Sequence, residues 1–440
     1  MASTTGFIFD YSKCVGCHAC MVACYVENET KPPLSWRNVN HFNREKLPLL
    51  GFVHQSIACN HCKDAPCMKA CPANAFSFDT ETGAVIHNKE VCIGCKYCTW
   101  ACPFDAPKFN EIEGIIEKCH LCYHRLKEGK IPACALNCPT GALSFGEIPE
   151  NPHPDTFGFS QKPIFPRILV KGSNIVNSVP ELDASVSGFD KSLQKSASTA
   201  TPSNEINPLH ELPLALFTYI SSLLVGWFSA NPFQNSFNIP LWVFGTLGLI
   251  AMLLSTFHLG KPTRAYHSIR NLKTSWLSRE ILLFGIFMVT GSIALFINSS
   301  IVQYVGIAIG FAFLISIEMV YSVAVKKYKT PIHSSNTILT ALTFLTLAGQ
   351  LWNVLIVMLA IKTLLFTVRT GTDKRSQKLW FSLIVLTRLV AGFIVPFSFI
   401  AFRNAEFSVG VILLVAMGEL VDRILFYGDF SPERPFSNVQ

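Results

Sequence analysis

Hydrophobic residues are spread unevenly along this chain of 440 residues, and their pattern divides the chain into distinct parts. Residues 1–150 are polar on average, whereas residues 212–428 are mostly apolar. Between them, residues 151–211 are rich in Ser, Pro and Asn without apolar periodicity, which predicts an extended or disordered linker. Residues 429–440 form a C-terminal tail.

The apolar part predicts an all-α bundle of eight transmembrane helices, because its segments approach the roughly 20 residues that cross a bilayer. The segments are residues 212–230, 240–258, 280–298, 301–324, 336–349, 351–368, 379–397 and 407–427. The fifth and sixth are short, and one long tilted helix over residues 336–368 is the alternative to them.

The polar part carries short, partly alternating apolar runs at residues 6–10, 76–79, 84–87 and 142–145. Runs of this kind predict small strands. The predicted fold class is therefore multidomain, with an α+β domain over residues 1–150 followed by the helical bundle.

Basic residues gather on one side of the predicted bundle. The loops after the second, fourth and sixth segments hold twelve Lys and Arg residues, and the opposite loops hold one, Arg403. Such an excess marks cytoplasmic loops, so both termini and residues 1–150 are expected in the cytoplasm. The twelve are Lys261, Arg264, Arg270, Lys273, Arg279, Lys326, Lys327, Lys329, Arg369, Lys374, Arg375 and Lys378.

Composition favours a membrane protein over a nucleic-acid-binding one. Half of the residues are hydrophobic and only 15% are charged, which is below the share in ordinary globular domains. The net charge of +7 lies largely in loops, where topology accounts for it, so no nucleic acid partner is expected. Residues 1–10 show no export signal. We expect a multi-pass protein of the bacterial cytoplasmic (inner) membrane.

All sixteen cysteines lie in four quartets before residue 139. The first and third quartets read C-x2-C-x2-C-x3-C, the spacing with which bacterial ferredoxins hold two [4Fe–4S] clusters. Sixteen thiolates at four per cluster predict four [4Fe–4S] clusters in a ferredoxin-like domain of two tandem two-cluster modules. The quartets are Cys14, Cys17, Cys20, Cys24; Cys59, Cys62, Cys67, Cys71; Cys92, Cys95, Cys98, Cys102; and Cys119, Cys122, Cys134, Cys138.

In this motif the fourth cysteine of a quartet holds the neighbouring cluster. We therefore expect the second and third quartets to exchange their fourth cysteines, and the first and fourth quartets to do the same. The predicted ligand sets are Cys14, Cys17, Cys20 with Cys138; Cys119, Cys122, Cys134 with Cys24; Cys59, Cys62, Cys67 with Cys102; and Cys92, Cys95, Cys98 with Cys71.

Two other roles for the cysteines are weaker. Disulfides need an oxidising compartment, and cysteines three residues apart in a row are poor disulfide partners. Zinc sites also use C-x2-C pairs, but they have no use for a third cysteine at the same interval followed by Cys-Pro.

Six ionisable residues lie within the predicted spans, where charges are costly and either mark function or pair with each other. At a rise of about 1.5 Å per residue, all fall between the midplane and the basic side. Glu318, Arg388 and Glu419 are candidates for polar groups near a quinol or a proton path. Internal ion pairing and snorkelling is the alternative, above all for the other three. These are Lys362, Asp422 and Arg423.

A second constellation lies at the loop between the second and third segments. His258 ends one segment, Glu280 opens the next, and Arg264 lies between them. A histidine and a carboxylate can bind the two hydroxyls of a quinol and accept its protons, although both can also be ordinary interfacial residues. No haem is expected, because the other histidines near the spans read as linker or loop residues rather than axial ligands.

Residues 92–103, Cys-Ile-Gly-Cys-Lys-Tyr-Cys-Thr-Trp-Ala-Cys-Pro, and the pattern over residues 119–143 resemble the four-cluster subunit of the dimethyl sulfoxide reductase family of molybdenum enzymes. The stretches 258–265, 275–280 and 418–428 are similar to the separate membrane anchor subunit of that family. The chain therefore looks like a fusion of the two subunits.

The resemblance implies that the anchor oxidises menaquinol to menaquinone without haem, with His258 and Glu280 at the quinol site. Electrons would then pass through four clusters to a molybdopterin catalytic subunit. It also implies that the clusters of the second and third quartets face the membrane and the others face the partner. In the best-known members the cluster subunit lies outside the cytoplasm, whereas the basic loops here predict the cytoplasmic side. Nitrate or another oxidised anion is therefore an alternative substrate to dimethyl sulfoxide.

Two rival functions stay open at this point. The same machinery can run backwards and reduce quinone with electrons from a dehydrogenase or a soluble ferredoxin. A protein of a different class, a membrane redox sensor or scaffold, would need no quinone site, and four clusters are more than a sensor needs.

Overall fold

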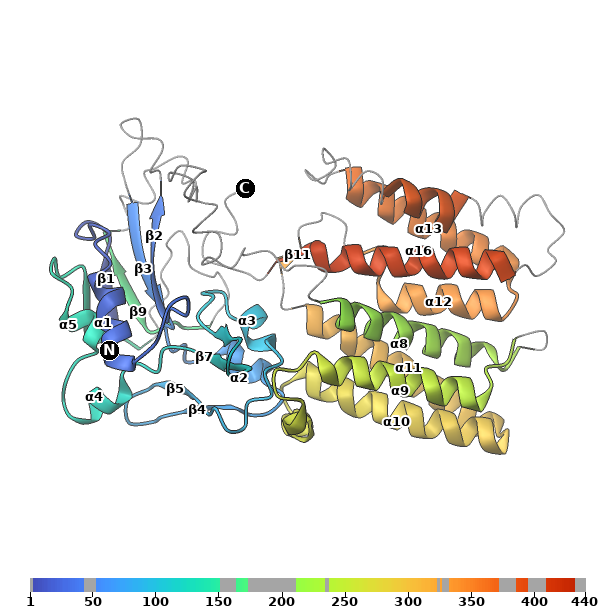
Figure 1. The fold of residues 1–440 in the computed structure, drawn as a ribbon, viewed down its shortest axis with the longest axis horizontal. Helices are drawn as coiled ribbons and strands as arrows, with labels where there is room; N and C mark the ends of the chain where they lie inside the picture. The colour runs from blue at the N-terminus through green and yellow to red at the C-terminus, as the bar shows by residue number, and fades with distance from the viewer. Residues whose placement is uncertain are drawn as a thin grey trace. The chain divides into compact units, whose positions relative to one another are not determined.

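The computed structural model describes residues 3–42, 53–150, 164–172, 211–233, 237–322, 325–326, 332–371, 385–394 and 409–431 (Figure 1). The chain divides into two compact units, Met1–Asn204 with Pro432–Gln440, and Glu205–Ser431.

The first unit is organised around strand β1 (Ser3–Asp10), the middle strand of a three-stranded sheet. It pairs antiparallel with β8 (Leu143–Pro149) and parallel with β9 (Ile168–Lys171). Its inward residues Phe7 and Phe9 are buried. Strand β9 lies within the stretch 151–211 that the sequence predicts to be an extended or disordered linker, and its short apolar run pairs with the edge of β1.

Three antiparallel hairpins and five short helices complete the first unit, which is mixed α and β. The four strands predicted from the sequence are confirmed as parts of β1, β4, β5 and β8, whereas the other two hairpins were not predicted. The hairpins are β2 (Arg37–Phe42) with β3 (Val53–Ala58), β4 (Phe76–Phe78) with β5 (Val85–His87), and β6 (Lys108–Asn110) with β7 (Ile115–Glu117). The helices are α1 (Ala19–Asn28), α2 (Pro66–Ala70), α3 (Tyr97–Ala101), α4 (Tyr123–Lys127) and α5 (Ala133–Leu136).

The second unit is helical, and its long helices lie side by side as a bundle (Figure 1). Two short strands, β10 (Val325–Lys326) and β11 (Phe430–Ser431), pair with each other. The helices are α8 (Leu212–Ala230), α9 (Leu241–Phe257), the 3-10 helix η1 (Pro262–Ile269), α10 (Trp276–Ile297), α11 (Ser300–Tyr321), α12 (Thr337–Ala348), α13 (Trp352–Gly371), the π-helical turn η3 (Val390–Ile394) and α16 (Val409–Gly428).

Within the described residues, four helices are long and apolar enough to cross a membrane: α8, α10, α11 and α13. A fifth candidate is α9 with η1, which meet at an angle of 103°. Helix α12 has only 12 residues, and the seventh predicted segment, 379–397, is described only over residues 385–394. Eight spans therefore stay a prediction, while a helical region with several candidate membrane helices is observed.

The stretch 336–368 is two helices rather than one. Helix α12 ends before Gly349, and Gln350 adopts a left-handed φ of 53° ahead of α13. Lys362 of α13 donates to Thr340 of α12 at 3.0 Å, so the two helices fold back on each other. The single tilted helix considered from the sequence is excluded by this contact.

Apolar side chains cover the outside of the helical unit as well as its interior. Trp242, Val289 and Phe296 are among its exposed large hydrophobic residues. Helices that are apolar all round are expected where lipid replaces water. Inside, α8 packs closely on α12 at Gly226, where a side-chain carbon would lie 2.2 Å from the carbonyl oxygen of Ala341. Small residues at such contacts are typical of membrane helix packing.

Candidate functional site

The first and third cysteine quartets are built on the same local backbone. Gly16 and Gly94 have φ near 70°, and His18 and Lys96, which precede helices α1 and α3, have φ near 60°. This left-handed turn bends the chain around one centre, so the first three cysteines of each quartet face the same point. The repeat of the turn explains why the two quartets share one spacing.

The cysteines gather in four crossed sets. Two cavities of the first unit are lined by one complete set each, with the fourth cysteine contributed by another quartet. We name the sets site A (Cys14, Cys17, Cys20, Cys138), site B (Cys24, Cys119, Cys122, Cys134), site C (Cys59, Cys62, Cys67, Cys102) and site D (Cys71, Cys92, Cys95, Cys98). Sites B and D are the two that line cavities.

Electrostatic neighbours identify the other two sets. Burial raises the pKa of Cys14, and the nearby thiolates of Cys20, Cys138 and Cys17 raise it further. Burial likewise raises the pKa of Cys62, followed by the thiolates of Cys59, Cys102 and Cys67. The crossed sets expected from the motif are thus brought together at sites A and C as well.

The four sites form a row. After burial, the thiolate that most raises the pKa of Cys119 in site B is Cys59 of site C. Cys67 of site C also raises the pKa of Cys98 in site D, after burial and the site D thiolates of Cys95 and Cys71. Sites A and B share Arg37, whose pKa is raised by thiolates from both. These neighbours indicate the order A–B–C–D.

The sites suit iron–sulfur clusters better than the alternatives. All sixteen cysteines are free thiols. In the part of the chain that the structure describes, no three His, Cys, Asp or Glu side chains lie close enough together to hold a single metal ion. Donors also point at sulfur: the backbone N–H groups of Ala75, Leu121 and Leu143 donate to Cys71, Cys119 and Cys138, each at 3.3 Å. Hydrogen bonds of this kind are a feature of cluster sites.

Two fully buried cations lie among the thiols. Arg37 is 2% exposed and donates to Ser56, whose hydroxyl lies 3.3 Å from the sulfur of Cys20. Burial opposes the charge of both cations, but thiolates hold the pKa of Arg37 and of Lys118 above their ordinary values. The negative charge that balances them comes from the cluster ligands.

The residues proposed for quinol lie together at one end of the helical unit. His258 caps the C-terminus of α9, Arg264 lies in η1, and Glu280 lies in the second turn of α10. The hydroxyl of Ser278 donates to the carbonyl of Ser268 at 2.7 Å, which ties α10 to η1. Glu280 is 5% exposed, whereas the other two are half-buried. The structure places the three in one hairpin without showing a direct contact between them.

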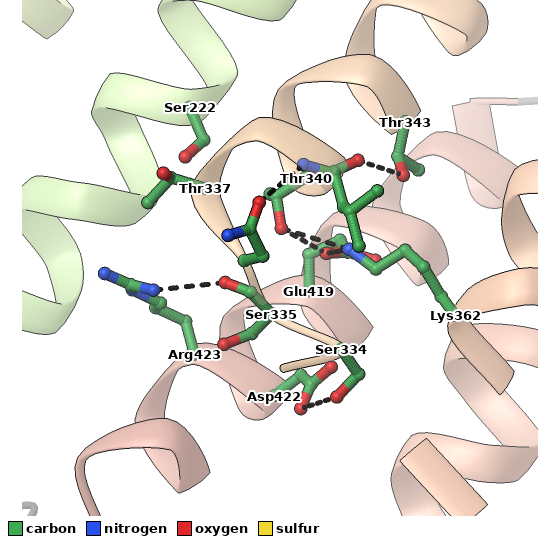
Figure 2. Close-up of polar contacts among 12 residues, drawn as sticks. Ser222, Ser334, Ser335, Thr337, Thr340, Thr343, Lys362, Glu419, Asp422 and Arg423 are labelled. Atoms are coloured by element: carbon green, nitrogen blue, oxygen red, sulfur yellow. Dashed lines mark hydrogen bonds and ion pairs between the residues drawn. The ribbon is translucent and has the colours of Figure 1, made fainter. Parts of the chain in front are cut away.

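Glu419 and Arg388, proposed as intramembrane polar groups, are both in a buried ionic network. Figure 2 shows Glu419 of this network beside Lys362 and Thr340. Arg388 donates to Glu419 at 2.9 Å and lies 3.6 Å from Asp422. Lys362 forms an ion pair with Glu419, and Thr340 donates to the same carboxylate at 2.9 Å. All four charged side chains are 0% exposed.

The network continues to the end of the bundle. Arg369 donates to Asp422 at 3.0 Å and also pairs with Asp429, which lies beside His333. Arg423 donates to Thr218 at 2.8 Å and to the carbonyl of Ser335 at 3.1 Å. Internal ion pairing, the alternative considered from the sequence, therefore holds for Lys362 and Asp422 and also for Arg388 and Glu419.

Glu318 has a separate structural role. Its carboxylate accepts from both the backbone N–H and the hydroxyl of Thr337, each at 2.8 Å. Thr337 is the first residue of α12, so Glu318 caps that helix together with Asn336. A carboxylate at a helix N-terminus is stabilising.

Sequence reasoning did not single out Arg37, Lys118 or His61 in the first unit, or the roles of Arg369 and Asp429 in the second. Lys118 directly precedes the first cysteine of the fourth quartet, but so does the exposed Lys13 in the first quartet, so sequence position alone does not identify a buried lysine. Arg37 lies in a strand with no cysteine nearby in sequence, so only the fold could reveal it.

Comparison with known proteins gives two family matches. Residues 52–148 match the 4Fe-4S dicluster domain, and residues 206–409 match the DMSO reductase anchor subunit. One polypeptide of the anaerobic dimethyl sulfoxide reductase of Escherichia coli is 41% identical over 158 residues, which is 34% of this chain and 77% of that protein.

Two further relatives cover the same part of the chain. The thiosulfate reductase electron transfer subunit of Salmonella typhi is 40% identical over 147 residues, 33% of this chain and 76% of that protein. One subunit of the tetrathionate reductase of Salmonella typhimurium is 38% identical over 148 residues, 33% of this chain and 58% of that protein.

Proposed function

The protein belongs to the dimethyl sulfoxide reductase family, with its iron–sulfur electron-transfer subunit and its anchor subunit in one polypeptide, and we propose that it oxidises menaquinol. The electrons would pass through four [4Fe–4S] clusters to a separate molybdopterin catalytic subunit. The relatives named above serve reductases of dimethyl sulfoxide, thiosulfate and tetrathionate, so the substrate of the complex is proposed to be an oxidised compound of this kind.

The observation that carries the proposal is the row of four crossed thiol sets. Each set offers four cysteines, and when bound a [4Fe–4S] cluster accepts and releases one electron at a time. The protein itself holds the sets in order, buries most of their cysteines, and aims backbone N–H groups at their sulfurs. A row of four sites suits conduction, whereas a sensor needs only one.

We place the quinol at the hairpin of α9, η1 and α10. Glu280 and His258 would accept the two quinol protons, and Arg264 would position the hydroxyl groups. Glu280 is buried and forms no ion pair with any other described residue, in contrast to Glu419. This supports the role, because a carboxyl without an ion-pair partner among the described residues can take up a proton at little cost. The basic loops favour a cytoplasmic position for the cluster domain, which would release these protons in the cytoplasm.

An EPR-monitored redox titration of membranes containing the protein tests the proposal, with and without a quinol-site inhibitor. We expect four cluster signals, at least one of them altered by the inhibitor. Glu280→Gln should abolish quinol oxidation and leave the four signals in place. If all four signals ignore both the inhibitor and the variant, the assignment of the quinol site is overturned. If protease added outside right-side-out vesicles cleaves residues 1–150, the proposed cytoplasmic orientation is overturned.

A further inference from the structure

We propose that Lys118 and His61 form a bridge between the two central cluster sites and set their reduction potentials, with Lys118 acting mainly on site C and His61 on site B. The inference rests on the proposed assignment of the sixteen cysteines to four clusters. It concerns how the path is tuned, which neither the family matches nor the crossed ligand sets specify.

Lys118 is held against both sites. Its ammonium group lies 3.6 Å from the sulfur of Cys59 in site C and donates to the carbonyl of Cys119 in site B at 2.9 Å. A third donor bond goes to the carbonyl of Val85. The side chain is 3% exposed, so water does not screen its charge.

His61 completes the contact in the opposite direction. The backbone N–H of Val85 donates to its Nδ1 at 3.0 Å, and its Nε2 lies 3.7 Å from the sulfur of Cys119. Because Nδ1 accepts a hydrogen bond, the single ring proton is on Nε2 and points at site B.

The two residues are reciprocal in sequence as well as in space. Lys118 directly precedes Cys119 of site B, yet its ammonium reaches a sulfur of site C. His61 directly precedes Cys62 of site C, yet its ring reaches a sulfur of site B. Val85 binds both, through its carbonyl and its N–H. Each site is therefore clamped by a residue anchored in the other.

The two contacts differ in strength. Hydrogen bonds to cluster sulfurs and the local charge both set the potential of a cluster. A cationic donor stabilises the added negative charge of a reduced cluster more than a neutral donor does. Lys118 should therefore raise the potential of site C strongly and that of site B less, and His61 should raise only that of site B.

Potentiometric EPR on membranes containing the full-length protein tests this order. In Lys118→Met we expect the site C potential to fall by at least the ~59 mV that a tenfold change in a one-electron equilibrium represents, with a smaller fall at site B. His61→Phe should lower the reduction potential of site B alone. Lys118→Arg, which keeps the charge, should restore most of the site C potential.

Lys96→Met is the matched control. Lys96 directly follows Cys95 of site D, but it is half-buried over the ring of Phe109, at 4.4 Å from the centroid. Solvent screens its charge, so we expect a much smaller shift at site D than Lys118→Met gives at site C.

The outcomes separate this inference from the proposed function. A wild-type protein with fewer than four clusters would overturn the assignment of the cysteines. Four clusters whose potentials all ignore Lys118→Met, or all shift equally, would overturn the bridge alone. If Lys118→Met assembles no clusters, a second measurement decides: the hyperfine coupling of 15N-labelled lysine to the reduced clusters, compared between the wild type and Lys118→Arg. Loss of the coupling in Lys118→Arg supports the bridge. Coupling that is unchanged in Lys118→Arg overturns it.

Discussion

Both units of the protein bury cations completely, but they balance them differently. In the helical unit Lys362 and Arg388 each meet the carboxylate of Glu419. In the first unit, no carboxylate pairs with Arg37 or Lys118 among the described residues, and the nearest negative groups are thiolates. One unit therefore carries its counter-charge in its own sequence, and the other needs its clusters to supply it.

This difference has an energetic consequence. An unpaired ion in a protein interior costs several kcal/mol even after relaxation. Thiols without clusters are neutral at pH 7 when burial raises their pKa, as it raises that of Cys71 to about 11. Without clusters, Arg37 and Lys118 would be buried beside neutral groups. The fold of residues 1–150 should therefore depend on the clusters, whereas the helical unit should not.

The largest expected effect is that of removing the clusters. In full-length protein made under iron starvation, residues 1–150 should lose their protection from protease, whereas the helices should keep theirs. Metal binding is coupled to folding in such sites. Limited proteolysis of membranes with mass spectrometry measures this directly. Equal protection of the first unit with and without iron would contradict the comparison, and helices that are cleaved too would show a general folding defect.

A smaller effect should follow from breaking one ion pair in the helical unit. Glu419→Gln leaves Lys362 and Arg388 without their shared carboxylate, and removing one partner of a buried pair costs about 3–5 kcal/mol. Thermal unfolding in detergent measures the loss. The double variant Glu419→Gln with Lys362→Met should lose less stability than the sum of the losses in the two single variants, because the pair acts as a unit. Strict additivity would show that the residues are not coupled.

The sequence predicts the cysteine sets and the charges within the apolar segments. It does not predict how the two units differ in balancing their buried cations. Cysteine spacing predicts the crossed sets because a thiol's place in the motif fixes which centre it faces. The charges of Glu419 and Asp422 stand out because they interrupt apolar segments. Arg37 gives no such signal: it is one polar residue in a short strand, and its role depends on the fold bringing thiols of sites A and B to it. Partners distant in sequence, such as Val85 for His61, likewise emerge only from tertiary packing.

The smallest effect is expected from a substitution that fills the space beside Arg388. It tests the packing around the ion network without changing any charge. A side-chain carbon at Gly418 of α16 would lie 2.3 Å from the Arg388 guanidinium and 2.6 Å from the backbone of Gly392. Because backbone cannot give way cheaply, Gly418→Ala should destabilise the helical unit by about 1–3 kcal/mol. Gly245→Ala on α9 is the control: nothing lies within 4 Å of the new carbon, so the helix should gain roughly 0.5–1 kcal/mol. The thermal unfolding temperatures of the two variants, measured in the same detergent, should therefore shift in opposite directions. Equal shifts would mean that charge pairing alone, without close helix contact, holds Arg388 in place.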